Sequence, residues 1–377
     1  MKGKQGMVCM GLLLVLSSCH TGKQITASGL QRKDFQTEVN GQHTDLFTLS
    51  NKQGMEVCIT NYGARVVSIL VPDRNGKRED VVCGFSTITE YMEQRQNFGS
   101  TVGRYIGRIL NARFTLDGVE YKLVPNNGKS GHISHGGNPG FADRIWKVEQ
   151  ADTHRVRLSY LSPDGENGFP GNLKVTLVYS LGEDDNALDL TYEATTDAPT
   201  VLNRSHHSFF SVSGNFTKSV EDQQLWVDAD RFTPYDDKKC VTGEYLPVAG
   251  TPLDFRMPHA IGECIDADHP QLKVVNGYDH TWELNTKGDD TRPAAWVYDP
   301  ASGRKMEIFT TEPGMQIYTG NGLKGKMTGK GRIAYPFRSA VCFETMHFQD
   351  SPNQPGFPST VLRPGEVFRS HTVYKFE

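Results

Sequence analysis

The sequence predicts an all-β protein, organised as a large antiparallel β-sandwich. Apolar and polar residues alternate in several runs, including residues 55–59, 173–179 and 188–192, and a period of two is typical of half-buried strands. Turn-forming clusters rich in glycine and proline separate these runs, and no long segment has the 3.6-residue period of a helix. Many short strands joined by such turns favour packed antiparallel sheets.

The chain begins with the features of an export signal. Two lysines precede the apolar run 7–16, and small residues lead to Cys19, an order that is typical of a signal peptide and too short to span a bilayer. Residues 16–19 resemble the lipobox of bacterial lipoproteins, although an ordinary signal with a chance cysteine would look similar. We expect residues 1–19 to be a lipoprotein-type signal peptide cleaved before Cys19, and residues 20–33 to form a flexible tether.

Two local elements follow from the same patterns in the rest of the chain. The best helical stretch, residues 87–96, is short. Residues 114–116 and 119–121 flank an Asp-Gly dipeptide, which suits a type I′ turn because both positions tolerate a positive φ, so we predict a hairpin here. Residues 34–377 contain no low-complexity linker, repeat or break in composition, which indicates one domain.

Composition narrows the classes of protein that fit. The chain has 377 residues, 37% of them hydrophobic, as in folded globular proteins. Its net charge of −4 is spread without long blocks of like charge, so we expect no nucleic-acid partner. No second apolar stretch could span a bilayer, which favours an exported bacterial lipoprotein, periplasmic or membrane-anchored, that contacts the membrane only through lipid on Cys19. The five later cysteines match no metal template, and we assign no disulfide.

One carboxylate, Glu344, lies within the apolar run 339–348, just before the turn-rich residues 350–356. Such a run is typical of a buried strand, where a glutamate is rare unless it is paired or hydrogen-bonded. Two interpretations remain open. Glu344 is either a solvent-facing strand residue or a catalytic carboxylate at a strand end, with its pKa raised by desolvation toward the value that a general base needs.

Two glycine-rich segments carry candidate binding residues. In residues 101–109, Arg108 offers a planar fork of donors for sugar hydroxyls or a carboxylate, although a surface salt bridge would use the same group. In residues 131–137, His132 and His135 have the spacing of a zinc pair, but no nearby glutamate completes the helical motif and the glycines would break its helix. We therefore expect no metal here, and a loop histidine that bonds a polar ligand fits better.

Further polar side chains stand among aromatic ones. His206 and His207 are adjacent in residues 203–210, and because neighbouring strand residues point to opposite faces, only one of them can face a given site. The segments around Asp279 and Gln316 add a carboxylate, an amide and several aromatic rings. A pyranose needs such a flat apolar surface with hydrogen-bonding groups beside it. No segment has a glycine-rich phosphate cradle or a nucleophile elbow.

Taken in order, these segments resemble the aldose 1-epimerase family, also called galactose mutarotases, from about residue 35 to the C-terminus. The resemblance rests on motifs at residues 103–109, 135–137, 203–210, 242–244, 277–280, 312–321 and 344–355. It implies a galactose mutarotase-like supersandwich with a shallow groove, a monosaccharide substrate, no cofactor, and a monomer or weak dimer. It also implies that Glu344 is the general base, that His207 is the general acid, and that the sugar is bound by Arg108, His135, Asp279 and Gln316.

Two positions depart from the family pattern. The residue before the site arginine, Gly107, and the residue before the acid histidine, His206, are both often asparagine in this family. The loop 126–134 also looks slightly longer than the usual connection. These departures leave the acid and the base in place but put the sugar preference in question.

The implied activity is the interconversion of the α and β anomers of free aldoses such as glucose and galactose, in hexose metabolism. Glu344 would take the proton of the hydroxyl on C1 and His207 would deliver one to the ring oxygen, so that the ring opens and recloses. We expect burial to raise the pKa of Glu344, and neighbouring carboxylates to keep His207 protonated. Two alternatives stay open: a glycoside hydrolase that uses Asp279 and Glu344, and a non-catalytic sugar-binding lipoprotein.

Overall fold

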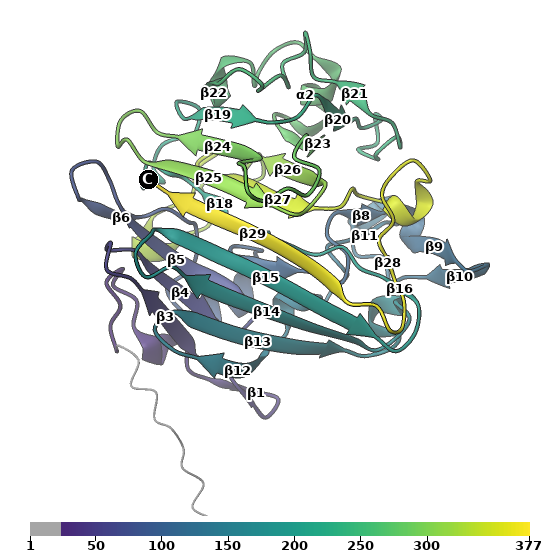
Figure 1. Ribbon diagram of the computed structural model, residues 1–377, viewed down its shortest axis with the longest axis horizontal. Coiled ribbons are helices and arrows are strands. Elements are labelled where there is room, and N and C mark those ends of the chain that lie inside the picture. The colour runs from purple at the N-terminus through teal and green to yellow at the C-terminus, as the bar shows by residue number, and fades with distance from the viewer. Residues whose placement is uncertain (1–23) are drawn as a thin grey trace, which may run out of the picture.

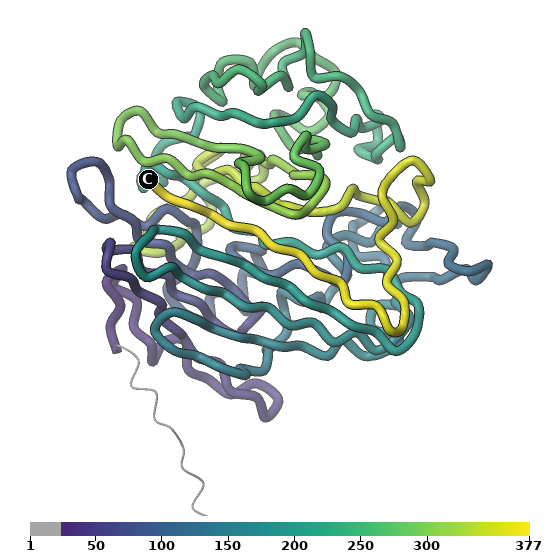
Figure 2. Tube along the Cα trace, in the orientation of Figure 1, coloured from purple at the N-terminus to yellow at the C-terminus, as the bar shows by residue number. Residues whose placement is uncertain are grey.

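The computed structural model describes residues 24–377, and its largest element is a nine-stranded antiparallel sheet (Figure 1). The C-terminal strand β29 runs through the middle of this sheet, between β15 and β25 (Figure 2). From edge to edge, the strands are β12 (Lys147–Ala151), β13 (Arg155–Ser162), β14 (Leu173–Leu181), β15 (Ala187–Thr196), β29 (Phe368–Phe376), β25 (Lys305–Thr310), β24 (Ala295–Tyr298), β19 (Gln224–Val227) and β22 (His259–Ala260).

A second layer packs against the nine-stranded sheet and consists of a six-stranded and a four-stranded antiparallel sheet. The segment 81–83 joins them, since Val81 N–H donates to the carbonyl oxygen of Ile69 and Cys83 N–H donates to that of Phe209, both at 2.9 Å. The strands in order are β18 (Phe209–Phe210), β27 (Val341–Met346), β26 (Gly314–Tyr318), β23 (Asp279–Glu283), β20 (Arg231–Thr233) and β21 (Leu246–Pro247), then β3 (Leu46–Ser50), β4 (Glu56–Thr60), β5 (Arg65–Pro72) and β6 (Arg78–Asp80).

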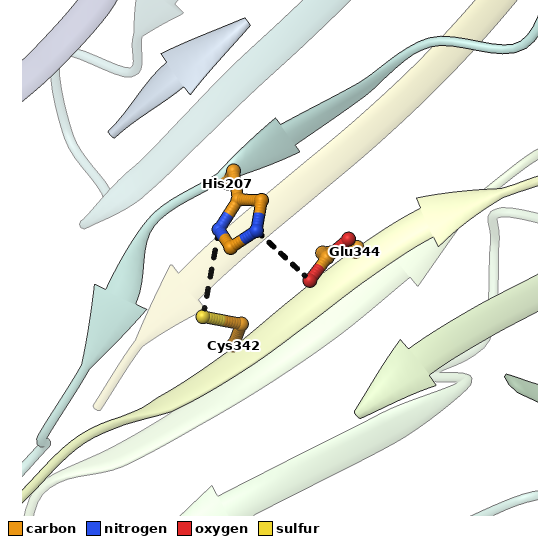
Figure 3. Close-up of side chains that lie close together, drawn as sticks. All are labelled: His207, Cys342 and Glu344. Carbon is orange, nitrogen blue, oxygen red and sulfur yellow. Dashed lines mark hydrogen bonds and ion pairs between the residues drawn. The ribbon is translucent and has the colours of Figure 1, made fainter. Parts of the chain in front are cut away.

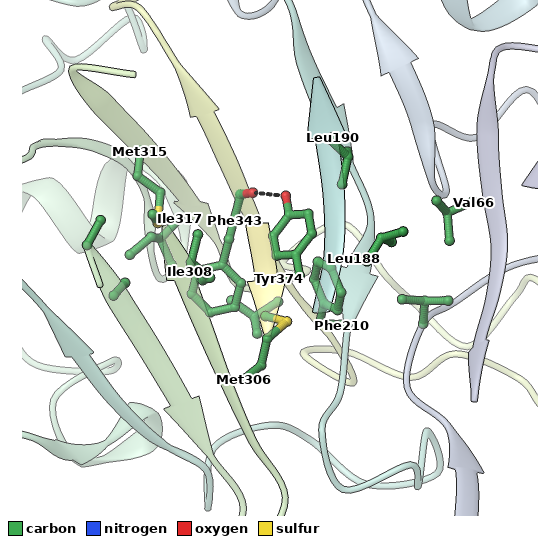
Figure 4. Packing of buried hydrophobic residues seen from close by; sticks show 14 of the residues in the cluster. Val66, Leu188, Leu190, Phe210, Met306, Ile308, Met315, Ile317, Phe343 and Tyr374 are labelled. Carbon is green, nitrogen blue, oxygen red and sulfur yellow. Dashed lines mark hydrogen bonds between the residues drawn. The ribbon is translucent and has the colours of Figure 1, made fainter. Parts of the chain in front are cut away.

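The hydrophobic core lies between these two layers (Figure 4). Phe343 of β27 packs into this core, and its carbonyl oxygen accepts a hydrogen bond from Tyr374 Oη of β29 at 3.1 Å. Thr345 Oγ1 lies 2.7 Å from Thr372 Oγ1 of the same strand. Because strand residues alternate between faces, Glu344 points to the opposite face of β27, away from the nine-stranded sheet.

Short elements outside these three sheets complete the fold. The remaining strands are β1 (Glu38–Val39), β2 (Gln42–His43), β7 (Ser100–Val102), β8 (Arg108–Ile109), β9 (Arg113–Leu116), β10 (Val119–Lys122), β11 (Ile133–Ser134), β16 (Thr200–Val201), β17 (Ser205–His207) and β28 (Val361–Leu362). The α-helices are α1 (Ile88–Gln94) and α2 (Pro270–Val275), and single 3₁₀ turns occur at Arg32–Phe35, Leu110–Ala112, Gly128–Ser130, Phe141–Asp143, Glu166–Gly168, Ile261–Glu263, Lys330–Arg332 and Ser351–Asn353.

The predicted elements are found where the sequence placed them. The all-β sandwich is confirmed, and β9 and β10 form the expected hairpin, with a φ of 52° at Asp117 and 79° at Gly118. The helical stretch 87–96 contains α1, which begins with Thr87 as N-cap and a capping box to Glu90. Sequence reasoning missed α2, because its six residues are too few to show a helical period.

The predicted signal peptide, residues 1–19, and the lipidation site Cys19 lie outside the described residues. The expected tether at residues 20–33 is wrong for its described part, because residues 24–33 pack on the fold. Thr26 and Leu30 are buried there, and Ala27 N–H donates to Glu56 Oε1 at 2.7 Å. From residue 24 onward, every helix is too short or too polar to cross a bilayer, and all five cysteines are free.

A buried ion pair joins the residue before β17 to the connection between β25 and β26. Arg204 Nη2 lies 2.6 Å from Glu312 Oε1, with side-chain exposures of 1% and 3%. Glu312 Oε2 also lies 2.7 Å from His347 Nδ1, and the Arg204 guanidinium stands 4.1 Å above the Tyr192 ring. Burial alone would raise the pKa of Glu312, but Arg204 and His347 hold it down at about 2.

We expect Glu312→Gln to lower the free energy of unfolding by about 3–5 kcal/mol, since it leaves the buried charge of Arg204 uncompensated. Urea denaturation at pH 7 measures this loss. Asp117→Asn is the control, because it breaks the exposed pair with Arg363 and should cost less than about 1 kcal/mol. Equal losses in the two variants would contradict the structural role of the buried pair.

Candidate active site

A cavity of about 230 Å³ opens on the outer face of the six-stranded sheet. It brings together all six residues that the sequence suggested: Glu344, His207, Arg108, His135, Asp279 and Gln316. The other lining residues are Gln96, Asn97, Gly107, Ser134, Phe209, Tyr318, Met346 and Gln349. Convergent polar groups in a small concavity are typical of a ligand site, and the volume suits a ligand smaller than a drug-sized molecule.

The register of three neighbouring strands places the carboxylates and the amide together. Gln316 of β26 lies directly opposite Glu344 of β27 on one side and Thr281 of β23 on the other. Directly opposite residues of antiparallel strands share a face, and Asp279 shares it because it is two residues from Thr281. The order β27-β26-β23 therefore builds one wall of the cavity.

His207 comes from β17, which pairs with β7 and lies beside β27. Its Nε2 is 3.4 Å from Glu344 Oε1, and both side chains are buried (Figure 3). The imidazole stacks on the Phe209 ring with centroids 5.1 Å apart, and its Nδ1 faces Cys342 Sγ at 3.7 Å. The ring is thus held with one nitrogen directed at the carboxylate, as a proton-transfer pair requires. The solvent-facing interpretation of Glu344 is wrong.

Burial favours the neutral forms of both groups. Desolvation, with a smaller contribution from Asp279, raises the pKa of Glu344 well above its usual value. Desolvation and the neighbouring His135 lower the pKa of His207 well below its usual value. The expected direction for Glu344 is confirmed. The expectation that carboxylates keep His207 protonated is wrong, because the cost of removing an imidazolium from water outweighs their attraction.

Arg108 and His135 supply hydrogen-bond donors to the same cavity. Arg108 is half-buried, and its Nη1 donates to the carbonyl oxygen of Lys239 at 3.5 Å. His135 Nδ1 accepts from the backbone N–H of Gly107 at 3.4 Å, which leaves Nε2 to carry the proton of the neutral ring. Desolvation and the charge of Arg108 lower the pKa of His135 to about 4. This imidazole is therefore a neutral donor near pH 7.

Asp279 is fixed by its neighbours on the sheet. Gln316 Nε2 donates to Asp279 Oδ1 at 2.7 Å, and Gln316 Oε1 accepts from Thr281 Oγ1 at 2.5 Å. Desolvation raises the pKa of Asp279, whereas Arg108 and Gln316 oppose this shift. The chain of hydrogen bonds orients the carboxylate before any ligand arrives, and Oδ2 can accept from a ligand hydroxyl.

Arg65 of β5 is a positioning residue that sequence reasoning missed. Its buried guanidinium donates to the carbonyl oxygens of Gln96 at 2.6 Å, Phe98 at 3.2 Å and Ala142 at 2.8 Å. Gln96 and the adjacent Asn97 line the cavity. The sequence signal was a lone arginine at the start of an apolar strand, which does not reveal that its partners are backbone carbonyls far along the chain.

His206 lies on the other face of β17 from His207. Its Nε2 is 2.7 Å from Ser208 Oγ, and its ring packs near those of Tyr179 and Tyr374, with centroids 6.2 and 6.0 Å away. Desolvation lowers the pKa of His206 to about 3. His206 does not line the cavity, so only Gly107, of the two departures from the family pattern, lies at the site.

One group among residues 24–377 has ligand atoms close enough for a metal ion, and it coincides with the acid–base pair. Atoms of His207, Cys342 and Glu344 lie within 4.8 Å of one another. Desolvation raises the pKa of the Cys342 thiol well above its usual value, which disfavours the thiolate that a soft metal binds. The donor set therefore fits a proton-transfer pair better than a metal centre.

The His132 and His135 pair of the glycine-rich loop does not converge on one point. His132 Nε2 faces Cys240 Sγ at 3.3 Å, and His132 does not line the cavity that contains His135.

A larger cavity of about 510 Å³ lies elsewhere, near Asp73 and Arg304, and no histidine lines it. The facing imidazole and carboxyl groups of His207 and Glu344 therefore lie in the smaller cavity.

An antiparallel sandwich with a facing carboxylic acid and imidazole in a small polar cavity defines an enzyme that moves protons on a small hydroxylated ligand. The model of the aldose 1-epimerase family matches residues 45–375, and the chain belongs to this family. The galactose mutarotase of Sus scrofa is 38% identical over 330 residues, which covers 88% of this chain and 93% of the relative. The aldose 1-epimerase of Escherichia coli K12 is 36% identical over 339 residues, which covers 89% and 96% of the two chains.

Solved structures agree with this assignment. The aldose epimerase homologue from C. elegans superposes with a TM-score of 0.81 at 30% identity, over 89% of this chain and 99% of that chain. The galactose 1-epimerase of Lactobacillus acidophilus gives a TM-score of 0.78 at 28% identity, over 90% and 96%. The mutarotase-like sandwich that the resemblance implied is therefore confirmed.

We expect His206→Asn to flatten the dependence of stability on pH without affecting the site. The pKa of His206 is about 3 in the folded state and about 6.5 in an unfolded chain. The unfolded state thus binds one more proton between these values, and stability falls as the pH decreases through this range. Urea denaturation between pH 6 and pH 4 should show a slope lower by about 1.4 kcal/mol per pH unit in the variant.

The matched control is His154→Asn, at an exposed position, which should leave that slope unchanged. Since His206 points away from the cavity, the KM for a sugar substrate should stay within about twofold of wild type in both variants. A large KM change in His206→Asn would place this side chain at the site.

Proposed function

We propose that the protein interconverts the α and β anomers of free aldoses, with Glu344 as general base and His207 as general acid. The observation that carries this proposal is the 3.4 Å approach of His207 Nε2 to Glu344 Oε1 within a cavity that also contains Arg108 and Asp279. The printed names of the relatives, galactose mutarotase and aldose 1-epimerase, support the same isomerase activity.

The reaction requires two coordinated proton transfers. The Glu344 carboxylate accepts the proton of the hydroxyl on C1 while the His207 imidazolium donates a proton to the ring oxygen. The bond between C1 and the ring oxygen breaks, and C1 becomes an aldehyde carbon. Rotation about the C1–C2 bond presents the other face of the aldehyde, and the ring oxygen then attacks it as the two proton transfers run backwards.

The pair needs only one proton to perform this cycle. Burial places that proton on Glu344 in the resting protein, since the pKa of Glu344 is raised and that of His207 is lowered. Transfer from Glu344 Oε1 to His207 Nε2, 3.4 Å apart, creates the reactive ion pair without changing the net charge of the cavity. The incoming hydroxyl groups stabilise this ion pair, because they supply the hydrogen bonds that water would otherwise provide.

The other polar residues hold the part of the sugar that does not react. Arg108 and neutral His135 donate hydrogen bonds, whereas the Asp279 carboxylate accepts them. C1 must turn while the remaining hydroxyl groups stay fixed, so these contacts set the position of C1 against the acid and the base. The facing acid and base, His207 and Glu344, are what distinguish an epimerase from a protein that merely carries sugar, since a carrier needs only the binding contacts.

We expect Glu344→Gln to reduce kcat by roughly 10²–10⁴ and to change KM far less, because the amide keeps the shape of the side chain but cannot accept the proton. Polarimetry of freshly dissolved α-glucose and α-galactose measures both constants. The matched control is Glu283→Gln, which lies in β23 on the same face of the six-stranded sheet but outside the cavity and should retain wild-type turnover. Near-wild-type turnover in Glu344→Gln would remove Glu344 from the mechanism, and sugar release from an aryl glycoside would indicate hydrolysis.

We also propose that the protein is an exported bacterial lipoprotein with lipid on Cys19. The support is the order of two lysines, the apolar run 7–16 and the lipobox-like residues 16–19 in the sequence. A single N-terminal anchor would hold the sugar-binding sandwich beside a membrane, and none of the helices in residues 24–377 is long and apolar enough to span it.

Cys19→Ala should move the protein from the membrane fraction to the soluble fraction, and detergent should no longer be needed to extract it. Immunoblots of fractionated cells report this distribution. Cys58→Ala serves as the control, because this buried thiol lies in β4 and should leave the distribution unchanged. Equal membrane association of the wild type and Cys19→Ala would contradict lipidation at this residue.

A further inference from the structure

Gly107, directly before the site arginine, leaves space in the cavity that another residue fills. Its φ is +72°, and a Cβ placed on it would lie 2.4 Å from Gln349 Cγ and 2.8 Å from Gln349 Cδ. Such distances are too short for any real contact, so a side chain at position 107 and the present position of Gln349 exclude each other. The amide of Gln349, from another part of the chain, therefore occupies the space that a side chain at position 107 would need.

Gln349 is held firmly in this position. It follows β27 by three residues, and the whole residue is only 4% exposed. Its Nε2 donates to Tyr235 Oη at 2.7 Å and to Gln316 Oε1 at 3.4 Å. Its Oε1 accepts from the backbone N–H of Arg108 at 3.2 Å. The side chain is therefore bonded to two other residues of the cavity, Arg108 and Gln316.

The hydrogen bonds that the Gln349 amide already makes show which of its donor and acceptor positions remain for a ligand. Both protons of Gln349 Nε2 are directed at Tyr235 and Gln316. A carbonyl oxygen accepts two hydrogen bonds, and the Arg108 N–H uses one position on Oε1. One acceptor position stays available in a cavity that Gln349 lines. A sugar hydroxyl is the donor that would complete it.

We propose that Gln349 is a sugar-binding residue of this chain and that it takes the space that a side chain at position 107 would otherwise fill. The inference rests on the proposed function, since the ligand is taken to be an aldose. Gln349 accepts a hydrogen bond from one hydroxyl group beside those bound by Arg108. Gly107 and Gln349 thus act as one unit that determines which aldoses fit, because a buried acceptor disfavours a ligand that lacks its hydroxyl.

Three variants test the proposed role of Gln349 beside Gly107: Gln349→Ala, Gly107→Asn, and the two combined. Each is assayed by polarimetry on a panel of aldoses. Gln349→Ala should raise KM by about tenfold for the preferred aldose, as expected for one lost hydrogen bond, with kcat within about threefold. Gly107→Asn alone should raise KM at least as much, because the new side chain collides with Gln349. The double variant should return KM to within about threefold of wild type, since the asparagine then occupies the vacated space.

A panel of monodeoxy aldoses separates binding from a purely structural role. In the wild type, loss of one particular hydroxyl should raise KM by about tenfold, and in Gln349→Ala the same loss should have almost no effect. If Gln349→Ala weakens all analogues equally, or if the double variant is no better than Gly107→Asn, the inference is wrong. Thermal melts of each variant show whether a rise in KM is accompanied by a loss of folded stability.

The test also separates this inference from the function on which it rests. A wild-type protein that leaves the optical rotation of every aldose unchanged would overturn both. An active wild-type protein whose KM is unaffected by Gln349→Ala would overturn the role of Gln349 alone.

Discussion

The site depends on one constraint, which is that strand β27 is buried on both faces. On the inner face, Phe343 and Thr345 are hydrogen-bonded to Tyr374 and Thr372 of the nine-stranded sheet. These contacts fix the register of β27, and a slip of one residue would turn Glu344 into the hydrophobic core. The contacts that stabilise the sandwich therefore also determine which side chain the strand presents to the cavity. The six residues of β27 therefore stabilise the sandwich and also position the carboxyl group of the site.

Burial of the acid–base pair has a chemical consequence beyond the pKa shifts themselves. The neutral distribution, with the proton on Glu344 and none on the His207 ring, is the distribution that ring opening produces. The pair therefore moves from separated charges to neutral groups as the aldehyde forms, a change that the burial of both side chains favours. The opposite change accompanies reclosure, so the bound sugar has to stabilise the charged state. In the proposed mechanism, the contacts of Arg108, His135 and Asp279 with the sugar would thus affect proton transfer as well as affinity.

The sequence predicted those parts of the structure that depend on local pattern or on motifs. The alternation predicted the strands, the Asp-Gly dipeptide predicted the hairpin, and the motifs predicted six site residues, all of which line the cavity. Properties that depend on distant partners were missed. Arg65 donates to carbonyl oxygens 31 to 77 positions away, and Gln349 accepts from an N–H 241 positions away. The proton distribution at His207 was misjudged because solvation depends on the packing of Phe209 and Cys342, which no local pattern reveals.

The hydrogen bonds of Arg65 to the residues around the cavity affect how fast a sugar can bind and leave. One buried guanidinium bonds the carbonyl oxygens of Gln96, Phe98 and Ala142, so two loops beside the cavity share a single fixed support. Substrate and product of an anomer exchange differ only at C1, and either anomer must leave as readily as the other enters. A rim that is fixed in advance needs no closing movement and costs little conformational entropy on binding. We therefore expect the rates of sugar binding and release at this site to be governed by diffusion of the sugar and not by the opening of a lid.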